Sequence, residues 1–83
     1  MLDPVLLPFL RCPETRQTLT LHRLEEIASL AAAVASGAAV SRGGKIVTPA
    51  PETLLLREDG RVAYPVRGGI PLLLVEEGIE TLG

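Results

Sequence analysis

Residues 61–74 constrain the fold more than any other part of this chain. They read Arg-Val-Ala-Tyr-Pro-Val-Arg-Gly-Gly-Ile-Pro-Leu-Leu-Leu, so two prolines and two adjacent glycines interrupt apolar runs. Pro65 and Pro71 fix φ and lack an N–H donor, whereas Gly68 and Gly69 permit positive φ. The pattern predicts a strand, a sharp turn and a second strand. Because the stretch holds no nucleophile, paired carboxylates or histidine, it indicates a role in holding a shape rather than in catalysis.

The rest of the chain predicts an α+β fold around a small antiparallel sheet of three to four strands. Asp3 and Pro4 favour the start of a short N-terminal helix, because Asp caps helices and Pro suits the first helical position. Apolar residues at helical spacing predict a helical insertion at about Leu24 to Ala35. Strands are expected at residues 18–22, 54–57, 61–64 and 70–75.

We expect one domain over residues 1–83, since a chain of 83 residues is long enough for one small domain. Its β part would comprise 1–22 and 53–75, with the helical insertion and a loop at 23–52 and a flexible tail at 76–83. Asp59-Gly60 predicts a two-residue hairpin of type I′. The residues that we assign to structural turns are Asp59, Gly60, Pro65, Gly68, Gly69 and Pro71. Substitution should impair folding most at Asp59-Gly60 and Gly68-Gly69.

Composition restricts the classes of protein that the chain can belong to. Hydrophobic residues make up 47% of the chain but aromatic residues only 2%, so aliphatic side chains must fill the core. A net charge of −2 argues against a dedicated nucleic-acid binder. The single cysteine excludes a disulfide within the chain and favours the cytoplasm. The sequence has no run of about 18–20 apolar residues and so predicts no membrane span.

The expected last strand is apolar on both faces. Ile70, Leu72 and Leu74 share one face and Leu73 and Val75 the other, because side chains alternate along a strand. Burying both faces is difficult in so small a protein, so we expect a partner to cover this strand by adding a strand of its own. The chain therefore carries a predicted protein-binding surface.

Two further residues join the predicted partner-binding set. Tyr64 is either a core ring with its hydroxyl on a backbone partner, which we favour, or a direct contact. Arg67 either holds the tight turn by bonding carbonyls or contacts the partner. The candidate partner-binding residues are Tyr64, Arg67, Ile70, Leu72 and Leu74.

Several segments together resemble a known family of small proteins. They are Leu-Asp-Pro at 2–4, Leu-Arg-Cys-Pro at 10–13, Gly-Arg-Val-Ala-Tyr-Pro-Val-Arg at 60–67 and Gly-Ile-Pro at 69–71. In order and spacing they resemble the tRNA methyltransferase 112 activator subunit and its short bacterial relatives. The resemblance covers both ends of the chain, with the predicted helix inserted between them.

The resemblance implies a zinc-ribbon-like fold and a non-catalytic role. Family members of known role bind S-adenosylmethionine-dependent methyltransferases that act on tRNA, rRNA or a translation release factor. By this resemblance the chain would be an adaptor or activator subunit, not an enzyme, and its partner a class I methyltransferase.

The chain departs from that family at the metal. Zinc-binding relatives use two C-x-x-C pairs, and the corresponding positions here are Cys12, Thr15, Leu56 and Asp59. Structural zinc requires four ligands from Cys, His or carboxylate. We therefore predict no zinc and no other cofactor, with Cys12 as a small half-buried hydrophobe. Residual metal binding through Cys12 and His22 stays open, although a lone histidine at a strand end is more often a surface residue.

Two alternatives belong to other classes. The chain could be a small structural protein that forms a homodimer and covers the last strand with its own copy. It could also be a weak RNA-binding ribbon, which would require clustering of Arg11, Arg16, Arg57, Arg61 and Arg67 on one face.

Overall fold

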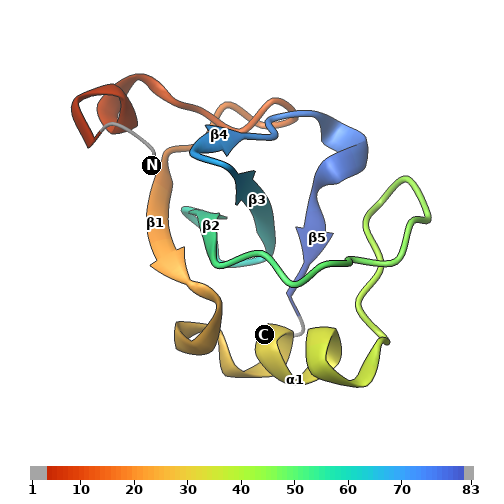
Figure 1. The fold of residues 1–83 in the computed structure, drawn as a ribbon. Coiled ribbons are helices and arrows are strands. Elements are labelled where there is room, and N and C mark those ends of the chain that lie inside the picture. The colour runs from red at the N-terminus through yellow and green to blue at the C-terminus, as the bar shows by residue number, and fades with distance from the viewer. Residues whose placement is uncertain (1–3, 82–83) are drawn as a thin grey trace.

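The computed structural model describes residues 4–81 (Figure 1). The expected cap at Asp3 lies outside these residues. In chain order the elements are η1 (Pro4–Phe9), β1 (Leu19–Arg23), η2 (Leu24–Glu26), α1 (Ala28–Ser36), β2 (Thr53–Arg57), β3 (Val62–Arg67), β4 (Ile70–Pro71), η3 (Val75–Glu77) and β5 (Ile79–Glu80), where η denotes a 3-10 helix.

The strands form one antiparallel sheet in the order β1-β2-β3-β4, with β5 also paired to β3. β4 pairs with the C-terminal end of β3, where Val66 lies opposite Pro71. β5 pairs with the opposite end of the same strand, where Ala63 lies opposite Ile79. The predicted α+β class with an antiparallel sheet is thus confirmed, with five strands rather than three or four.

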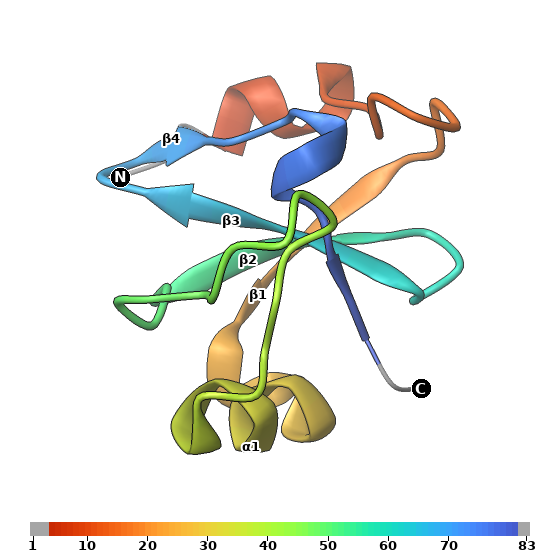
Figure 2. The same ribbon diagram turned by 90° about the vertical axis from the view of Figure 1, so that its right-hand side faces the viewer.

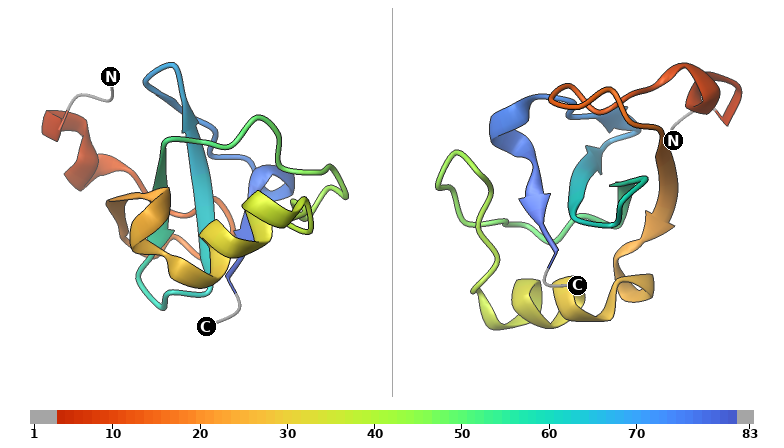
Figure 3. Two further views of the ribbon diagram at one scale, coloured as in Figure 1. Left: turned by 60° about the horizontal axis from the view of Figure 1, so that its bottom comes forward. Right: turned by 180° about the vertical axis from the view of Figure 1, so that it is seen from behind.

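Each face of the sheet supports its own hydrophobic core. On the first face η1 and residue Leu73 pack against the buried cluster of Cys12, Leu19, Leu55, Val62, Tyr64 and Val66. On the second face α1 and the segment after it contribute Leu30, Ala39 and Val47, which pack with Leu54, Ala63 and Ile79 of the sheet. Figures 2 and 3 show the sheet between these two layers, with η1 and α1 at opposite ends of the molecule.

The N-terminal helix is a 3-10 helix, and its period decides which side chains are exposed. Side chains three residues apart lie above one another in a 3-10 helix. Leu7 and Leu10 accordingly pack against the first core, while Leu6 and Phe9 form an exposed stripe on a different side of the helix. The proline inside the helix, Pro8, lacks the N–H that a longer α-helix would need.

The predicted insertion at Leu24 to Ala35 is divided at Ile27. The backbone of Ile27 lies outside the helical region, with φ −110° and ψ 81°. Before it, the N–H of Leu24 donates to the carbonyl of Glu52 and continues the pairing of β1, so η2 forms only a single turn. α1 then runs to Ser36 and ends at Gly37, which adopts the left-handed conformation that glycine favours.

The C-terminal region differs most from prediction. The expected strand over residues 70–75 is wrong, because β4 comprises only Ile70–Pro71. The N–H of Leu72 still donates to the carbonyl of Pro65, but Leu73 then packs against the first core and the chain enters η3. The doubly apolar strand on which partner binding was predicted therefore does not form.

The predicted flexible tail at 76–83 is also wrong for the residues that the structure describes. Ile79 is buried in the second core and pairs with Ala63. Gly78 makes this path possible, since a Cβ at that position would lie 3.0 Å from Val62 Cγ1 and 3.1 Å from Tyr64 Cε1. Close packing at a glycine, which hydrophobic periodicity does not reveal, holds this segment against the sheet.

The two predicted turns have different outcomes. Gly68 and Gly69 both adopt positive φ, 60° and 79°, as a tight turn between β3 and β4 requires. At the β2–β3 connection only Gly60 has positive φ, so the predicted type I′ turn at Asp59-Gly60 is wrong. The N–H of Gly60 instead donates to the carbonyl of Arg57, and the side chain of Asp59 is left to bond Arg57 and the N–H of Arg61.

Candidate functional site

A buried polar cluster surrounds the single cysteine. Cys12 lies just after η1 and is only 1% exposed. Its Sγ lies 3.0 Å from the hydroxyl of Tyr64, a fully buried residue of β3. The guanidinium of Arg57, at the end of β2, approaches the same sulfur at 3.9 Å. The sequence predicted Cys12 as a small half-buried hydrophobe among apolar groups. The structure shows instead that Cys12 is buried and that its sulfur accepts hydrogen bonds.

Arg57 holds this cluster together. Its side chain is 7% exposed and bonds Asp59 through two nitrogens, with Nε to Oδ1 at 2.9 Å and Nη2 to Oδ2 at 2.8 Å. Its Nη1 lies 3.2 Å from Glu14 Oε1. The same carboxylate of Glu14 pairs with Arg42 at 2.5 Å. A two-nitrogen contact to a carboxylate is among the strongest ion pairs in proteins. Together these contacts join two distant segments, at Glu14 and at Arg42, to the end of β2.

The cluster shifts the ionisation of its members. Burial opposes ionisation of the Cys12 thiol, but hydrogen bonds from Tyr64, from the side chain and backbone of Thr15 and from the backbone of Glu14 lower its pKa to about 6. Burial and the contact with Cys12 raise the pKa of Tyr64 above its ordinary value. Arg42 and Arg57 hold the pKa of Glu14 below its usual range. At neutral pH the thiolate is thus stabilised inside a closed, hydrogen-bonded cluster.

The four positions that were compared with zinc ligands do not converge on one point. Cys12 and Asp59 both contact Arg57, but Leu56 is partly buried against the second core on the other face of the sheet. The guanidinium of Arg57 lies between the sulfur and the carboxylates of Glu14 and Asp59. Among residues 4–81 no group of three or more His, Cys, Asp or Glu side chains could hold a metal ion.

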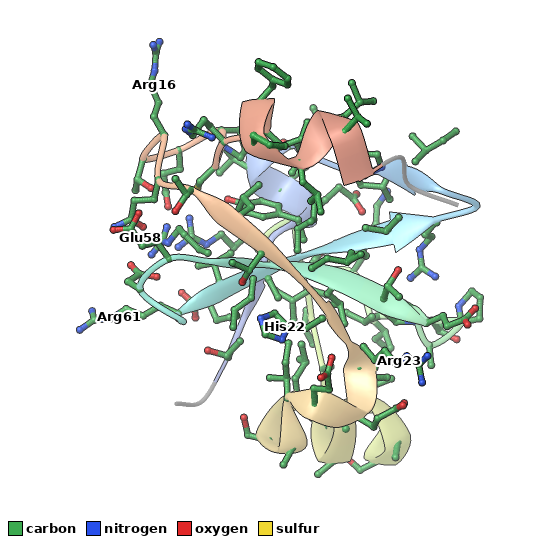
Figure 4. The ribbon with its side chains drawn as sticks, turned by 90° about the vertical axis from the view of Figure 1, so that its left-hand side faces the viewer. Arg16, His22, Arg23, Glu58 and Arg61 are labelled. Carbon is green, nitrogen blue, oxygen red and sulfur yellow. The ribbon has the colours of Figure 1, made fainter. Side chains whose placement is uncertain are left out.

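His22 is a half-exposed side chain on β1. Its Nε2 lies 2.9 Å from Thr20 Oγ1, and its Nδ1 lies 3.9 Å from Glu26 Oε1. Leu19 of β1 packs with Cys12, and by alternation His22 points to the other face of the sheet, where Figure 4 shows it on the side of β1 toward α1. The two therefore do not form a joint metal or catalytic site. The reading of His22 as a surface residue agrees with this position.

A second feature is the exposure of four large apolar side chains on η1, on β4 and on the segment that follows β4. Phe9 is 76% exposed and Ile70 65% exposed, and more than half of Leu74 and half of Leu6 are accessible. η1 and β4, which carry Phe9 and Ile70, lie at the same end (Figures 1 and 2). We call these four residues, Leu6, Phe9, Ile70 and Leu74, the end surface.

The predicted partner-binding residues divide between core and surface. Tyr64 is fully buried, so it is a core ring and not a direct contact. Its hydroxyl lies on the sulfur of Cys12 and not on the predicted backbone partner. Leu72 is partly buried. Arg67 donates from Nη1 to the carbonyl of Pro49 at 2.8 Å. Ile70 and Leu74 are the two that join the end surface, while sequence reasoning missed Leu6 and Phe9, whose exposure follows from the 3-10 period of η1.

The arginines do not form the basic face that the RNA-binding alternative requires. Arg57 is buried in its ion pairs with Glu14 and Asp59. In Figure 4 the acidic Glu58 lies between Arg61 and Arg16, whose side chain extends away from the molecule. Sequence reasoning also missed that Arg57 and Asp59 form an ion pair, although their spacing around a predicted turn was the available signal.

Comparison with known proteins corrects the family resemblance. No family model matches the chain. It is 33% identical over 75 residues to a UPF0434 protein of Hyphomonas neptunium (strain ATCC 15444), a match that covers 90% of this chain and 56% of that protein. The chain thus spans about half the length of this relative. Among residues 4–81 no helix is long and apolar enough to cross a membrane.

A solved structure covers more of both chains. The solution NMR structure of XF2673 from Xylella fastidiosa matches with a TM-score of 0.71 and 32% sequence identity, over 98% of this chain and 84% of that one. Neither similarity is to the tRNA methyltransferase 112 activator family, so the assignment to that family was wrong. The protein is instead a homologue of a UPF0434 protein and shares its fold with XF2673.

Proposed function

We propose that this protein is a non-catalytic binding module whose end surface packs against an apolar patch of a partner protein. The observation that supports this most directly is the exposure of Phe9 on a helix whose opposite side is anchored in the core. Large exposed apolar side chains that lie together in one patch often mark interaction sites. The end surface gathers such side chains from η1 and from the region of β4.

The way in which η1 is held favours binding. Leu7 and Leu10 fix the helix to the first core, so Leu6 and Phe9 are presented in a defined position before any partner arrives. Less conformational entropy is then lost on association. Aromatic residues surrounded by apolar neighbours are frequent hot spots of protein interfaces, and Phe9 is one of only two aromatic residues in the chain.

The identity of the partner is a separate question. A methyltransferase as partner rested on the family resemblance that is now overturned, and it stays an untested prediction. The same applies to the zinc-ribbon-like description of the sheet and to a cytoplasmic location. The proposal concerns a folded protein partner with an apolar patch that matches the end surface.

A comparison of two variants tests the proposal. The tagged full chain and its Leu6→Ser/Phe9→Ser variant are expressed in the native cell, and co-purifying proteins are quantified by mass spectrometry. We expect one stoichiometric partner to fall at least tenfold in the variant and to remain with Ile46→Ser, an exposed apolar residue of the 40–47 loop. Equal recovery from all three chains would refute the end surface as a binding site.

Direct binding completes this test. The partner so identified is purified and titrated with the chain, and the Phe9 variant should bind it at least tenfold more weakly. Sedimentation velocity distinguishes the homodimer alternative: a concentration-dependent dimer that Phe9→Ser disrupts would assign the end surface to a second copy of this chain instead.

A further inference from the structure

A small polar hollow opens on the second face of the sheet, where the segment after α1 crosses it. The hollow has a volume of about 180 Å³ and lies between residues 45–48, the C-terminal end of β3 and η3. Figures 1 and 2 show the loop that leads into this segment beside η3. The polar side chains that line the hollow are those of Ser41, Lys45, Thr48, Arg67 and Glu77. Since ligand sites for organic molecules are usually larger, a hollow of this size suits a small ion.

The first positive charge in the hollow belongs to Arg67, the last residue of β3. Val66 is part of the first core, so by alternation the side chain of Arg67 points to the second face. There its Nη1 donates to the carbonyl of Pro49 at 2.8 Å, which holds the half-buried guanidinium against the crossing segment. Among residues 4–81 no carboxylate pairs with it. Its other N–H groups can therefore donate to an anion in the hollow.

The second positive charge comes from Lys45. Its side chain is exposed and forms no ion pair with any residue that the structure describes. Two hydroxyls lie close by, on Ser41 and on Thr48. The Ser41 Oγ accepts from the backbone N–H of Lys45 at 3.4 Å and keeps its own proton to donate. Two cations and two hydroxyl donors thus line one hollow, which is the composition of an oxyanion site.

The frame of the hollow is in place before any ion binds. The N–H of Ser41 donates to the carbonyl of Lys45 at 2.8 Å, and the N–H of Val47 donates to the carbonyl of Ala39 at 3.0 Å. Ser41 also forms a β-bridge with Ile79 of β5. Because these bonds fix the crossing segment to the sheet, binding an ion costs little reorganisation of the chain.

The remaining charged group, Glu77, decides which oxyanion fits. Its half-buried carboxylate lines the hollow from η3, and two positive charges against one negative charge leave the hollow positive. A carboxylate only accepts hydrogen bonds, so it tolerates an anion beside it when that anion carries a proton to donate. At neutral pH inorganic phosphate carries at least one proton, whereas sulfate carries none. Glu77 therefore favours phosphate over sulfate.

We propose that this hollow binds inorganic phosphate, with unprotonated oxygens of the ion on Arg67 and Lys45 and its P–OH group donating to Glu77. A phosphate monoester has a second pKa of about 6 and has mostly lost this proton at neutral pH, so the free ion is the source that the hollow selects. The hollow shares no residue with the end surface. The site thus goes beyond the proposed function and stands or fails independently of it.

Titration with three anions provides the first test. The labelled full chain is titrated at neutral pH and constant ionic strength with inorganic phosphate, sulfate or phosphoserine, and its amide signals are followed by NMR. We expect phosphate to shift the amides of Lys45, Thr48 and Arg67 until they saturate. Sulfate and phosphoserine should bind at least tenfold more weakly. Equal or tighter binding of either would indicate an adventitious ion only, and shifts that do not saturate would likewise overturn the proposal.

Two neutral variants test the cations. Lys45→Gln and Arg67→Gln should each bind phosphate at least tenfold more weakly than the parent chain. Lys45 is exposed in a loop, so its variant keeps the fold even if the Arg67 variant does not. Arg61→Gln is the matched control, because Arg61 is an exposed arginine next to the other end of β3 and should leave the affinity unchanged. Unchanged affinity in Lys45→Gln, or an equal loss in Arg61→Gln, would contradict the assignment.

The contact with Glu77 has a readout of its own in the choice between the two ions. Glu77→Gln removes the negative charge that excludes sulfate, so sulfate should bind at least tenfold more tightly to this variant and the preference for phosphate should disappear. A purely structural role of Glu77 would weaken the binding of both ions alike. If the variant keeps the preference for phosphate, Glu77 does not accept the proton of the ion and the proposed site is wrong.

Discussion

Cys12 is the residue whose chemistry its surroundings alter most. Tyr64 and Thr15 donate to its sulfur and lower the thiol pKa to about 6. In an unfolded chain the thiol would titrate near its ordinary value of about 8.5. Because the folded pKa is the lower of the two, the folded state holds fewer protons between these values. Its stability therefore rises with pH through this window.

This linkage gives a prediction with a defined sign. The contribution of Cys12 to the free energy of unfolding should be fully present above about pH 8.5 and lost as pH falls through about 6. Urea denaturation between these values checks it, with Cys12→Ala as the reference that lacks the slope. The ultraviolet absorbance of the thiolate should titrate with a midpoint of about 6. A midpoint near the ordinary thiol value, or equal slopes in both chains, would contradict the prediction.

At the scale of single elements, β5 depends on close packing at Gly78. The segment would not reach the sheet if residue 78 carried a side chain, since Val62 and Tyr64 occupy that space. β5 in turn places Ile79 in the second core, and the N–H of Thr81 donates to the carbonyl of Arg61. A single methyl group is therefore enough to disturb the whole C-terminal segment.

Gly78→Ala should lower the free energy of unfolding by about 1–3 kcal/mol, the usual effect of overpacking a tight site. Hydrogen exchange should locate the change, with faster exchange at Ile79 and Thr81 and little change at Leu55 in β2. Ser29→Ala, on the exposed side of α1, is the control and should stay within about 0.5 kcal/mol. Equal exchange in the parent and variant chains would show that β5 tolerates the methyl group.

The elements also show what the sequence could and could not predict. The Gly68-Gly69 turn and the strands on either side of the β2–β3 turn follow from local signals, because glycine and apolar alternation act over a few residues. β5 and the division at Ile27 depend on contacts with distant residues. The same holds for the Cys12 cluster: Arg57 reaches Glu14 from 43 positions away in the chain, and no local pattern reveals that contact.

At the scale of the whole molecule, a single thin sheet carries two cores. Adjacent residues of β2 belong to different cores, since Leu54 packs with α1 and Leu55 packs with Tyr64. Neither core is large in a chain of 83 residues. Loss of β2 would therefore remove the support of both layers at once, which predicts that they unfold together.

Two probes can follow the two layers separately. Tyr64 is the only tyrosine and the chain has no tryptophan, so its fluorescence reports on the first core alone. Far-ultraviolet circular dichroism at the helical band reports mainly on α1, over the second core. If the molecule unfolds in one cooperative step, both signals have the same urea midpoint.

A substitution in one core makes this prediction stringent. Leu30→Ala removes a buried side chain of α1 from the second core and should lower the free energy of unfolding by about 2–5 kcal/mol. Although Tyr64 lies across the sheet, its fluorescence transition should shift to lower urea by the same amount as the helical signal. If the helical signal shifts alone, α1 and its core form a separately unfolding layer and the sheet is stable without it.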